Sequence, residues 1–307
     1  MKRINVILCL LPFYLLLFAS TISFGAATSP GESGESNSFI GAETCKECHE
    51  EQYESYAKTI HSRKAIKGPA TQDACESCHG AGALHVEKGG GRGVDIFAFN
   101  DETAASDRSA KCLQCHQTNH DMDLWEVGAH SRNEVSCDSC HDLHAYGGDQ
   151  RPEEPEICFS CHRDVRVDAN KRSRHAIIEG KISCTSCHEP HGSISEHMVK
   201  ADDPQQLCYS CHTDKRGPYI YEHPPVEENC RSCHTPHGSI HAKLLTEKLP
   251  NLCQDCHTWS RHPGTPYDGD SGFTGRSPSN RFFARSCLNC HGAIHGGNTF
   301  ENHALTR

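Results

Sequence analysis

The sequence predicts a fold of short α-helices and irregular coil with almost no β-structure. Gly and Pro are frequent, at 25 and 15 of 307 residues, and no alternating apolar pattern extends beyond a few residues. Only 36% of the residues are hydrophobic and the mean hydropathy is -0.63, so an aliphatic core is scarce. By contrast, 21 Cys and 24 His are present. So many possible ligands among so few apolar residues indicate that a metal or cofactor organises the fold.

The charge balance argues against two classes of partner. The chain has 30 Lys and Arg against 40 Asp and Glu, which gives a formal net charge of -10. No run of basic residues forms a stripe. We therefore expect neither nucleic acid nor an anionic lipid surface to be a partner.

The first 27 residues differ in composition from those that follow. A short basic start, Lys2 and Arg3, precedes an almost continuously apolar stretch over residues 4–18, and small residues suited to signal peptidase stand at 25–27. We expect a signal peptide over residues 1–27 and an exported, periplasmic domain over residues 28–307. An uncleaved anchor is the alternative, because the apolar stretch extends to about 20 residues. A lipoprotein site at Cys9 fits less well, since Leu8 precedes it.

The pattern C-x-x-C-H occurs ten times after the signal. It is the attachment sequence of c-type haem: the two thiols form thioethers with the porphyrin, and the adjacent His becomes the proximal iron ligand. We expect haem attachment at Cys45, Cys48, Cys75, Cys78, Cys112, Cys115, Cys137, Cys140, Cys158, Cys161, Cys184, Cys187, Cys208, Cys211, Cys230, Cys233, Cys253, Cys256, Cys287 and Cys290. The proximal ligands are then His49, His79, His116, His141, His162, His188, His212, His234, His257 and His291.

Three other readings of the motifs fit less well. Structural zinc sites need two halves in complementary spacing, and a His directly after each of ten Cys pairs would be a coincidence there. A redox dithiol would be expected once, on a thioredoxin-like pattern that is absent. Disulfides are possible in an exported protein. However, ten pairs spaced by only two residues make a poor set of cross-links.

An internal repeat selects the distal ligands from the 14 remaining His. Five units, at approximately 40–90, 105–150, 152–195, 202–242 and 248–300, each contain a motif, a lone His, a second motif and another His. Since Met122 and Met198 could serve two haems at most, His must supply the other distal positions. The expected distal ligands are His61, His85, His130, His144, His175, His191, His223, His237, His262 and His295, which leaves His120, His197, His241 and His303 on the surface.

The spacing constrains which haem each distal His serves. His144, His191 and His237 follow a proximal His by three residues, a path too short to reach the other face of the same ring. They are expected to ligate a neighbouring haem. The lone His is expected to return to the first haem of its own unit, as His61 could through residues 50–61, a predicted helix of about three turns. The Gly-rich segment 80–93 is expected to be a flexible connection, because it lacks the ending of a phosphate loop.

Exchange of ligands between neighbours would bring the rings close together, as electron hopping requires. Because each unit would contact mainly its neighbours, the five dihaem repeats predict an elongated haem wire.

Several segments resemble a known family. GAETCKECHEEQYESYAKTIHSRKA, CESCHGAGALHVEKGGG, CTSCHEPHGS, CRSCHTPHGS and CLNCHGAIHGGN look like segments of the decahaem periplasmic cytochromes of the MtrA/DmsE family. The resemblance implies ten bis-His haems c in a cytochrome that inserts into an outer-membrane β-barrel porin. It also implies electron transfer between periplasmic or inner-membrane donor cytochromes and an extracellular multihaem cytochrome or reductase, in anaerobic respiration. Ala81 departs from the Pro that is more common after the second motif.

Three functional classes remain open from the sequence. A conduit within a porin fits an acidic chain without an apolar stripe, because a barrel lumen is polar and lipid would exclude such a surface. A free periplasmic electron shuttle would have a similar sequence. A multihaem reductase needs one iron with an open distal position, yet all ten motifs end in His and ten distal His are available. We therefore expect an electron carrier and not an enzyme.

Overall fold

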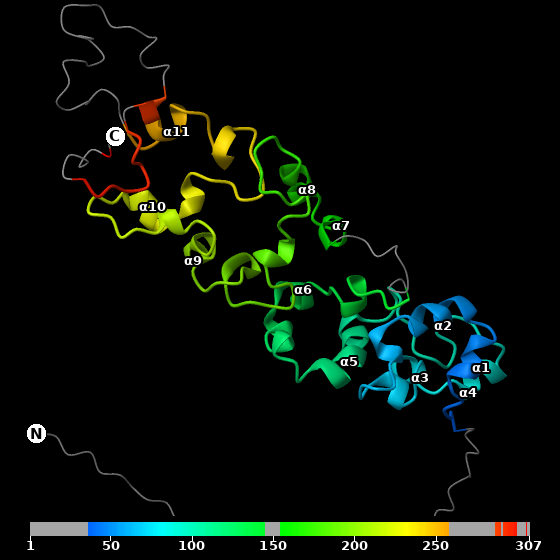
Figure 1. Ribbon diagram of the computed structural model, residues 1–307. Helices are drawn as coiled ribbons and strands as arrows, with labels where there is room; N and C mark the ends of the chain where they lie inside the picture. The colour runs from blue at the N-terminus through cyan, green and yellow to red at the C-terminus, as the bar shows by residue number, and fades with distance from the viewer. Residues whose placement is uncertain (1–35, 145–153, 258–285, 290, 300–304, 306–307) are drawn as a thin grey trace, which may run out of the picture. The chain divides into compact units, whose positions relative to one another are not determined.

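Short helices separated by irregular coil make up the chain (Figure 1). The computed structural model describes residues 36–144, 154–257, 286–289, 291–299 and 305. Apart from Ser36, these residues belong to one compact unit, Asn37–Arg307. The expected signal peptide lies outside the described residues.

Eleven α-helices of four to twelve residues are formed by the described residues. They are α1 (Ala42–Lys46), α2 (Glu50–Ala57), α3 (Glu76–His79), α4 (Ala83–Glu87), α5 (Ala105–His116), α6 (Ala129–Arg132), α7 (Glu154–Phe159), α8 (Arg163–Ala169), α9 (Pro204–Tyr209), α10 (Pro224–Glu228) and α11 (Asn251–Gln254). Within the described ranges no strand occurs, only isolated β-bridges such as Ser173 with Ser239. The predicted fold class is confirmed. None of these helices combines the length and apolarity needed to span a bilayer.

The helices follow the two positions that the motifs take in the repeat. The first motif of each unit begins on an α-helix: α1, α5, α7, α9 and α11 contain Cys45, Cys112, Cys158, Cys208 and Cys253. The second motif is on α3 in the first unit and begins with a 3-10 turn in the other four, as at Cys137–Ser139. Helix α9 has a side-chain cap at its start, which α1, α5 and α11 lack. Asp203 accepts a hydrogen bond from the backbone of Gln205 at 2.9 Å, and Pro204 takes the first helical position.

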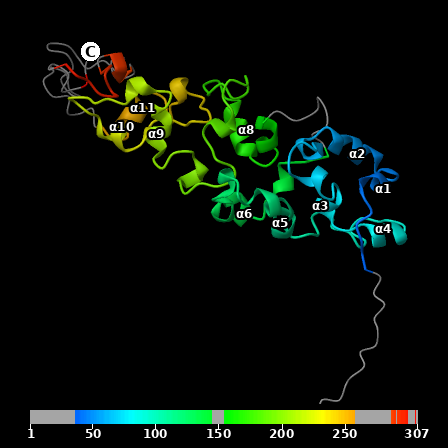
Figure 2. The ribbon, with the colours of Figure 1, turned by 60° about the horizontal axis from the view of Figure 1, so that its bottom comes forward.

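Two local predictions need correction. The predicted helix over residues 50–61 is shorter, because α2 ends at Ala57 and a separate 3-10 turn, Ile60–Ser62, carries the lone His. The Gly-rich segment 80–93 is not only a connection, since α4 lies within it and carries His85. Helices α1 to α4 lie together in both ribbon views (Figures 1 and 2).

The buried apolar core is small. Among the described residues, only Trp125, Phe159, Ala169 and Ile177 are buried hydrophobics, and the last three form one cluster. Within the described ranges, twelve large hydrophobic side chains are exposed, including Val167 at 66%. Polypeptide packing alone therefore gives this chain little hydrophobic stabilisation.

Replacing Phe159 with Ala should lower the free energy of unfolding by about 3 kcal/mol, because its side chain fills the buried cluster and is only 2% exposed. Val167→Ala, on the neighbouring helix α8, is the matched control and should change it by less than about 0.5 kcal/mol. Denaturant titration of both purified variants measures the difference. Equal effects would contradict the assignment of the core.

Candidate haem-binding centres

Each attachment motif is wound into one helical turn. In nine motifs the backbone N–H of the final His donates to the carbonyl of the first Cys, at 2.9–3.1 Å, and the tenth lies within α5. Side chains at positions i, i+3 and i+4 of such a turn lie on one face. The spacing of C-x-x-C-H therefore places two thiols and one imidazole on the same side of the backbone, as covalent attachment and axial ligation of one haem require.

Within each unit, the first Cys of one motif contacts the first Cys of the other motif. A hydrogen bond from Cys45 lowers the pKa of the Cys75 thiol to about 7, and a bond from Cys112 lowers that of Cys137 to about 6. The pairs are Cys45 with Cys75, Cys112 with Cys137, Cys158 with Cys184, Cys208 with Cys230, and Cys253 with Cys287. If haem is attached as the motifs predict, the two haems of a unit would be bound to the chain at adjacent places.

The second Cys residues connect one unit with the next. Burial raises the pKa of Cys78, and the nearby charge of Cys115, in the following unit, raises it further. The same relation holds for Cys140 with Cys161, Cys187 with Cys211, and Cys233 with Cys256. Attachment points thus neighbour one another alternately within units and between units.

The His rings are paired, and each pair joins a motif His to one of the expected distal His. Nine pairs occur among the described residues, with ring centres 6.0–6.3 Å apart. They are His49 with His85, His61 with His116, His79 with His144, His130 with His162, His141 with His191, His175 with His212, His188 with His237, His223 with His257, and His234 with His295.

These distances fit one iron between two imidazoles. A metal–imidazole bond is about 2 Å long and the ring centre lies about 1.2 Å behind the nitrogen, so two imidazoles on opposite sides of one iron would have centres about 6.4 Å apart. Structural zinc would need four ligands, and the described residues contain no group of three or more His, Cys, Asp or Glu suited to a metal ion.

The pairs follow one rule along the chain. The lone His of a unit lies beside the first motif His of the next unit, as His61 lies beside His116. The His after a second motif lies beside the second motif His of the preceding unit, as His144 lies beside His79. In the first unit, which has no predecessor, His85 lies beside His49.

The expected return of the lone His to its own unit is therefore wrong. His61 does not face the motif at Cys45, because its place beside His49 is taken by His85. The 3-10 turn after α2 directs His61 to the following unit instead.

Backbone carbonyls hold seven of the paired rings by Nδ1. A carbonyl can only accept, so Nδ1 carries the proton and Nε2 is left as the metal ligand. The bonds, at 2.7–3.1 Å, run from His79 to Phe97, His85 to Val94, His130 to Pro190, His175 to Pro236, His188 to His197, His223 to Ile294, and His234 to Lys243. Such outer contacts fix the orientation of a ligand and raise its basicity.

Three of these carbonyls directly precede the His that follows a second motif. Pro190, Pro236 and Ile294 accept from the lone His of the preceding unit. The Gly after that same His packs closely on the preceding unit: a Cβ at Gly192 would run into the carbonyl of Leu124, and one at Gly238 into that of Asp168. The sequence His-Gly after these motifs is thus required at the joint between two units.

The structural role of these carbonyls was not evident from the amino-acid sequence. The repeated CHEPHGS and CHTPHGS segments were the available signal, since both place Pro and Gly around the distal His.

Burial keeps several of the rings neutral. It lowers the pKa of His61, His79, His223, His237 and His295 below the ordinary value for His. The protonated form is disfavoured because it would have to lose its hydration. Neutral imidazole is the form that ligates iron.

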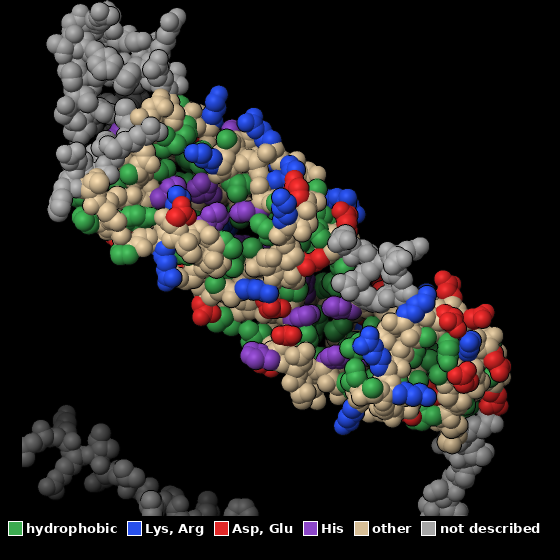
Figure 3. Space-filling model, viewed as in Figure 1, with side chains coloured by type: hydrophobic (Ala, Val, Ile, Leu, Met, Phe, Trp, Pro, Cys, Tyr) green, Lys and Arg blue, Asp and Glu red, His purple; other side chains and the backbone are tan. Residues whose placement is uncertain are grey.

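Exposed apolar side chains flank the ring pairs. Ile60 and Val86 adjoin His61 and His85 in sequence and are 57% and 51% exposed, and Ile194 is 77% exposed. The space-filling view shows His side chains gathered in hollows on this face of the molecule (Figure 3). Bound porphyrin would bury these apolar side chains by packing against them. This packing would compensate for the small apolar core of the polypeptide.

The remaining expected residues fall into two groups. His262, Cys290 and His303 lie outside the described residues. His120, expected on the surface, has a side chain that is 98% exposed. Met198 is no ligand in this arrangement, because its sulfur accepts a hydrogen bond from the backbone of Ala129 at 3.3 Å.

Comparisons with known proteins agree with this geometry. The family described as doubled CXXCH motif matches residues 175–217 and 223–262, the NrfB-like cytochrome c-type proteins match 75–153, and the family cytochrome c554 and c-prime matches 44–74. The two doubled-motif segments are out of phase with the five units. Each begins at a lone His and contains the motif His beside which that lone His lies, His212 or His257.

Two relatives show how far the likeness extends. The multiheme cytochrome MtrA of Shewanella baltica (strain OS185) is 38% identical over 273 residues, which cover 87% of this chain and 81% of that protein. The probable fumarate reductase Ifc3 of Shewanella frigidimarina (strain NCIMB 400) is 30% identical over 91 residues, but only 14% of that protein is covered. The chain thus belongs to the MtrA family of multihaem c-type cytochromes and is an electron-transfer protein that binds haem c.

Proposed function

We propose that this chain carries ten haems c, each with two His ligands, and that it conducts electrons across the outer membrane inside a porin. The observation that carries the proposal is the unbroken succession of His pairs, which runs from His49 with His85 to His234 with His295. The proposed proximal and distal ligands are the paired residues given above. His262 is proposed as the tenth distal ligand, by the count of motifs and repeats.

In this proposal each residue has a limited task. Bound haem supplies the iron that takes up and releases one electron. The two imidazoles of each pair would hold the iron between them, and the protein would then act as an electron carrier. Carbonyls such as those of Pro190 and Pro236 keep the rings oriented and the proton on Nδ1.

The proposed location is the periplasm, after export by the signal peptide, with attachment to the outer membrane through a porin. Proposed partners are the porin, periplasmic or inner-membrane donor cytochromes, and an extracellular multihaem cytochrome or reductase. The family likeness and the excess of acidic residues support this placement, because the polar lumen of a barrel accepts a surface that lipid would exclude. A free periplasmic shuttle is the second candidate.

The ligand exchange predicts a spectral difference between two His variants. His61→Ala removes a proposed axial ligand, so one iron of ten should become high-spin and bind one carbon monoxide per protein when reduced. His120→Ala should leave the spectra unaltered, because this ring is 98% exposed and pairs with Asp123. Magnetic circular dichroism and carbon monoxide titration measure the result. Unchanged low-spin spectra for His61→Ala would contradict the assignment.

The small core predicts that the polypeptide depends on haem to fold. The chain produced without its signal, in a host compartment that does not attach haem, should bind a hydrophobic dye and be digested rapidly by protease. The haem-loaded protein, treated in parallel, should resist digestion. A haem-free chain that resists protease equally and melts cooperatively would show that packing alone suffices.

The conduit predicts electron transfer through a sealed membrane. Liposomes that contain the cytochrome with its barrel partner and trap a reduced dye should lose the dye's electrons to an external oxidant that cannot permeate. Liposomes with the barrel alone or the cytochrome alone are the controls and should retain the reduced dye. If the cytochrome binds no barrel and stays free in the periplasm, the shuttle replaces the conduit.

A further inference from the structure

A polar contact recurs beside the paired thiols in three of the units. It joins the residue four positions before the first motif to the residue that follows the first Cys of the second motif. We call this contact the clasp; its residue pairs are Gly41 with Glu76, Arg108 with Asp138, and Glu154 with Thr185. The contacts differ in charge from one unit to the next.

In the first unit the clasp contains a buried negative charge. Glu76 is 3% exposed, and its carboxylate accepts from the backbone N–H groups of Ile40 at 3.1 Å and of Gly41 and Gly82 at 2.8 Å. No Lys or Arg among the described residues forms an ion pair with it. The carboxylate interacts electrostatically with the thiols of Cys45 and Cys75.

The third unit also has a carboxylate in its clasp, but it is half-buried and comes from the residue four positions before the first motif. Glu154, at the start of α7, accepts from the backbone N–H of Thr185 at 2.8 Å and from its hydroxyl at 2.9 Å. In the part of the chain that the structure describes, no cation pairs with Glu154. Its charge acts on Cys158 and Cys184, the paired thiols of this unit.

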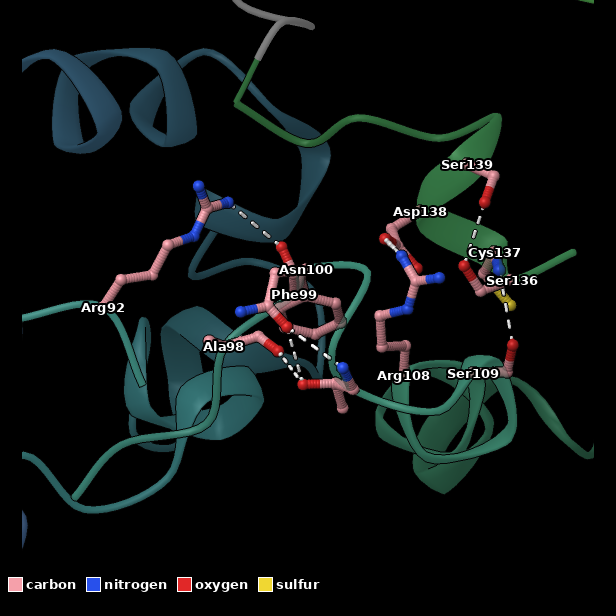
Figure 4. A network of polar contacts seen from close by, with 11 residues as sticks. Arg92, Ala98, Phe99, Asn100, Arg108, Ser109, Ser136, Cys137, Asp138 and Ser139 are labelled. Carbon is pink, nitrogen blue, oxygen red and sulfur yellow. Dashed lines mark hydrogen bonds and ion pairs between the residues drawn. The ribbon is translucent and has the colours of Figure 1, made fainter. Parts of the chain in front are cut away.

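The second and fourth units lack an uncompensated buried carboxylate at this place. In the second unit Arg108 pairs with Asp138 at 2.8 Å, and the two side chains are 12% and 23% exposed (Figure 4).

In the fourth unit the two clasp positions are Pro204 and the exposed Arg231. The buried residue beside the thiols of this unit is the neutral Gln205, which is 8% exposed. Its side-chain oxygen accepts from Cys230 at 3.5 Å, and its nitrogen donates to the carbonyl of Glu227.

We propose that Glu76 and Glu154 are tuning residues that lower the reduction potentials of the haem pairs in the first and third units. Oxidised haem iron has one more positive charge than reduced iron, so a nearby carboxylate shielded from water favours the oxidised state. The ion pair of the second unit cancels this effect, and the amide of the fourth unit does not produce it. The inference rests on the proposed attachment of haem at both motifs of each unit.

Spectropotentiometric titration of the full haem-loaded protein tests the tuning. Glu76→Gln and Glu154→Gln keep the shape of the side chain and remove its charge. In each variant the portion of the titration that corresponds to two of ten haems should move to higher potential. Gln205→Glu, which adds a buried charge beside the paired thiols of the fourth unit, should move the portion for two haems to lower potential.

Glu196→Gln is the matched control, because Glu196 is 77% exposed and water screens its charge. Its titration should superimpose on that of the wild type. Intact mass and the low-spin spectrum verify in each variant that ten haems with two axial ligands remain. These two checks report on the proposed haem sites independently of the potentials.

Two outcomes would overturn the tuning. The first is a wild-type titration for Glu76→Gln and Glu154→Gln while ten low-spin haems are retained. The second outcome applies when a variant of Glu76 or Glu154 fails to load haem. The test then depends on Gln205→Glu, and the proposal is overturned if the reduction potentials of this variant are not lower than those of the wild type.

Discussion

The pairing of His rings between consecutive units is the constraint on which the rest of this structure depends. Every joint between two units is crossed in both directions, as when His61 points forward to His116 and His144 points back to His79. A unit therefore cannot complete its own pair of centres. The close packing of Gly192 and Gly238 on the preceding units, and the carbonyl bonds from Pro190 and Pro236, serve the same joints.

This constraint explains the unusual composition of the chain. Where residues from neighbouring units meet at one iron, the cofactor would connect the polypeptide segments. Among the described residues, the apolar side chains that the protein itself buries are then few: Trp125 and the cluster around Phe159. The same meeting points bring the attachment thiols of successive centres close together, alternately within and between units. The same contacts would thus connect the units and bring the haems close enough for electron transfer. The acidic groups beside the thiols would make the reduction potentials of the haem pairs differ.

The local parts of this architecture could be predicted from the sequence. The spacing of C-x-x-C-H determines the local geometry of each motif, because one turn of helix places its two Cys and its His on one face. Whether His61 lies beside a motif of its own unit or of the next unit was not predictable. Sequence spacing does not define the direction of the 3-10 turn that carries it. The role of Glu76 was equally hidden. Its partners Ile40 and Gly41 lie more than 30 residues away in sequence, and it occupies a variable position of its motif.

The number and coordination of the irons test this account most directly. We predict that the intact mass of the exported protein equals that of residues 28–307 with ten haems and no free thiol. We also predict that low-temperature electron paramagnetic resonance of the same sample shows only low-spin iron. A mass with fewer haems, or a high-spin signal equal to one whole haem in the wild type, would contradict the proposed ligand exchange.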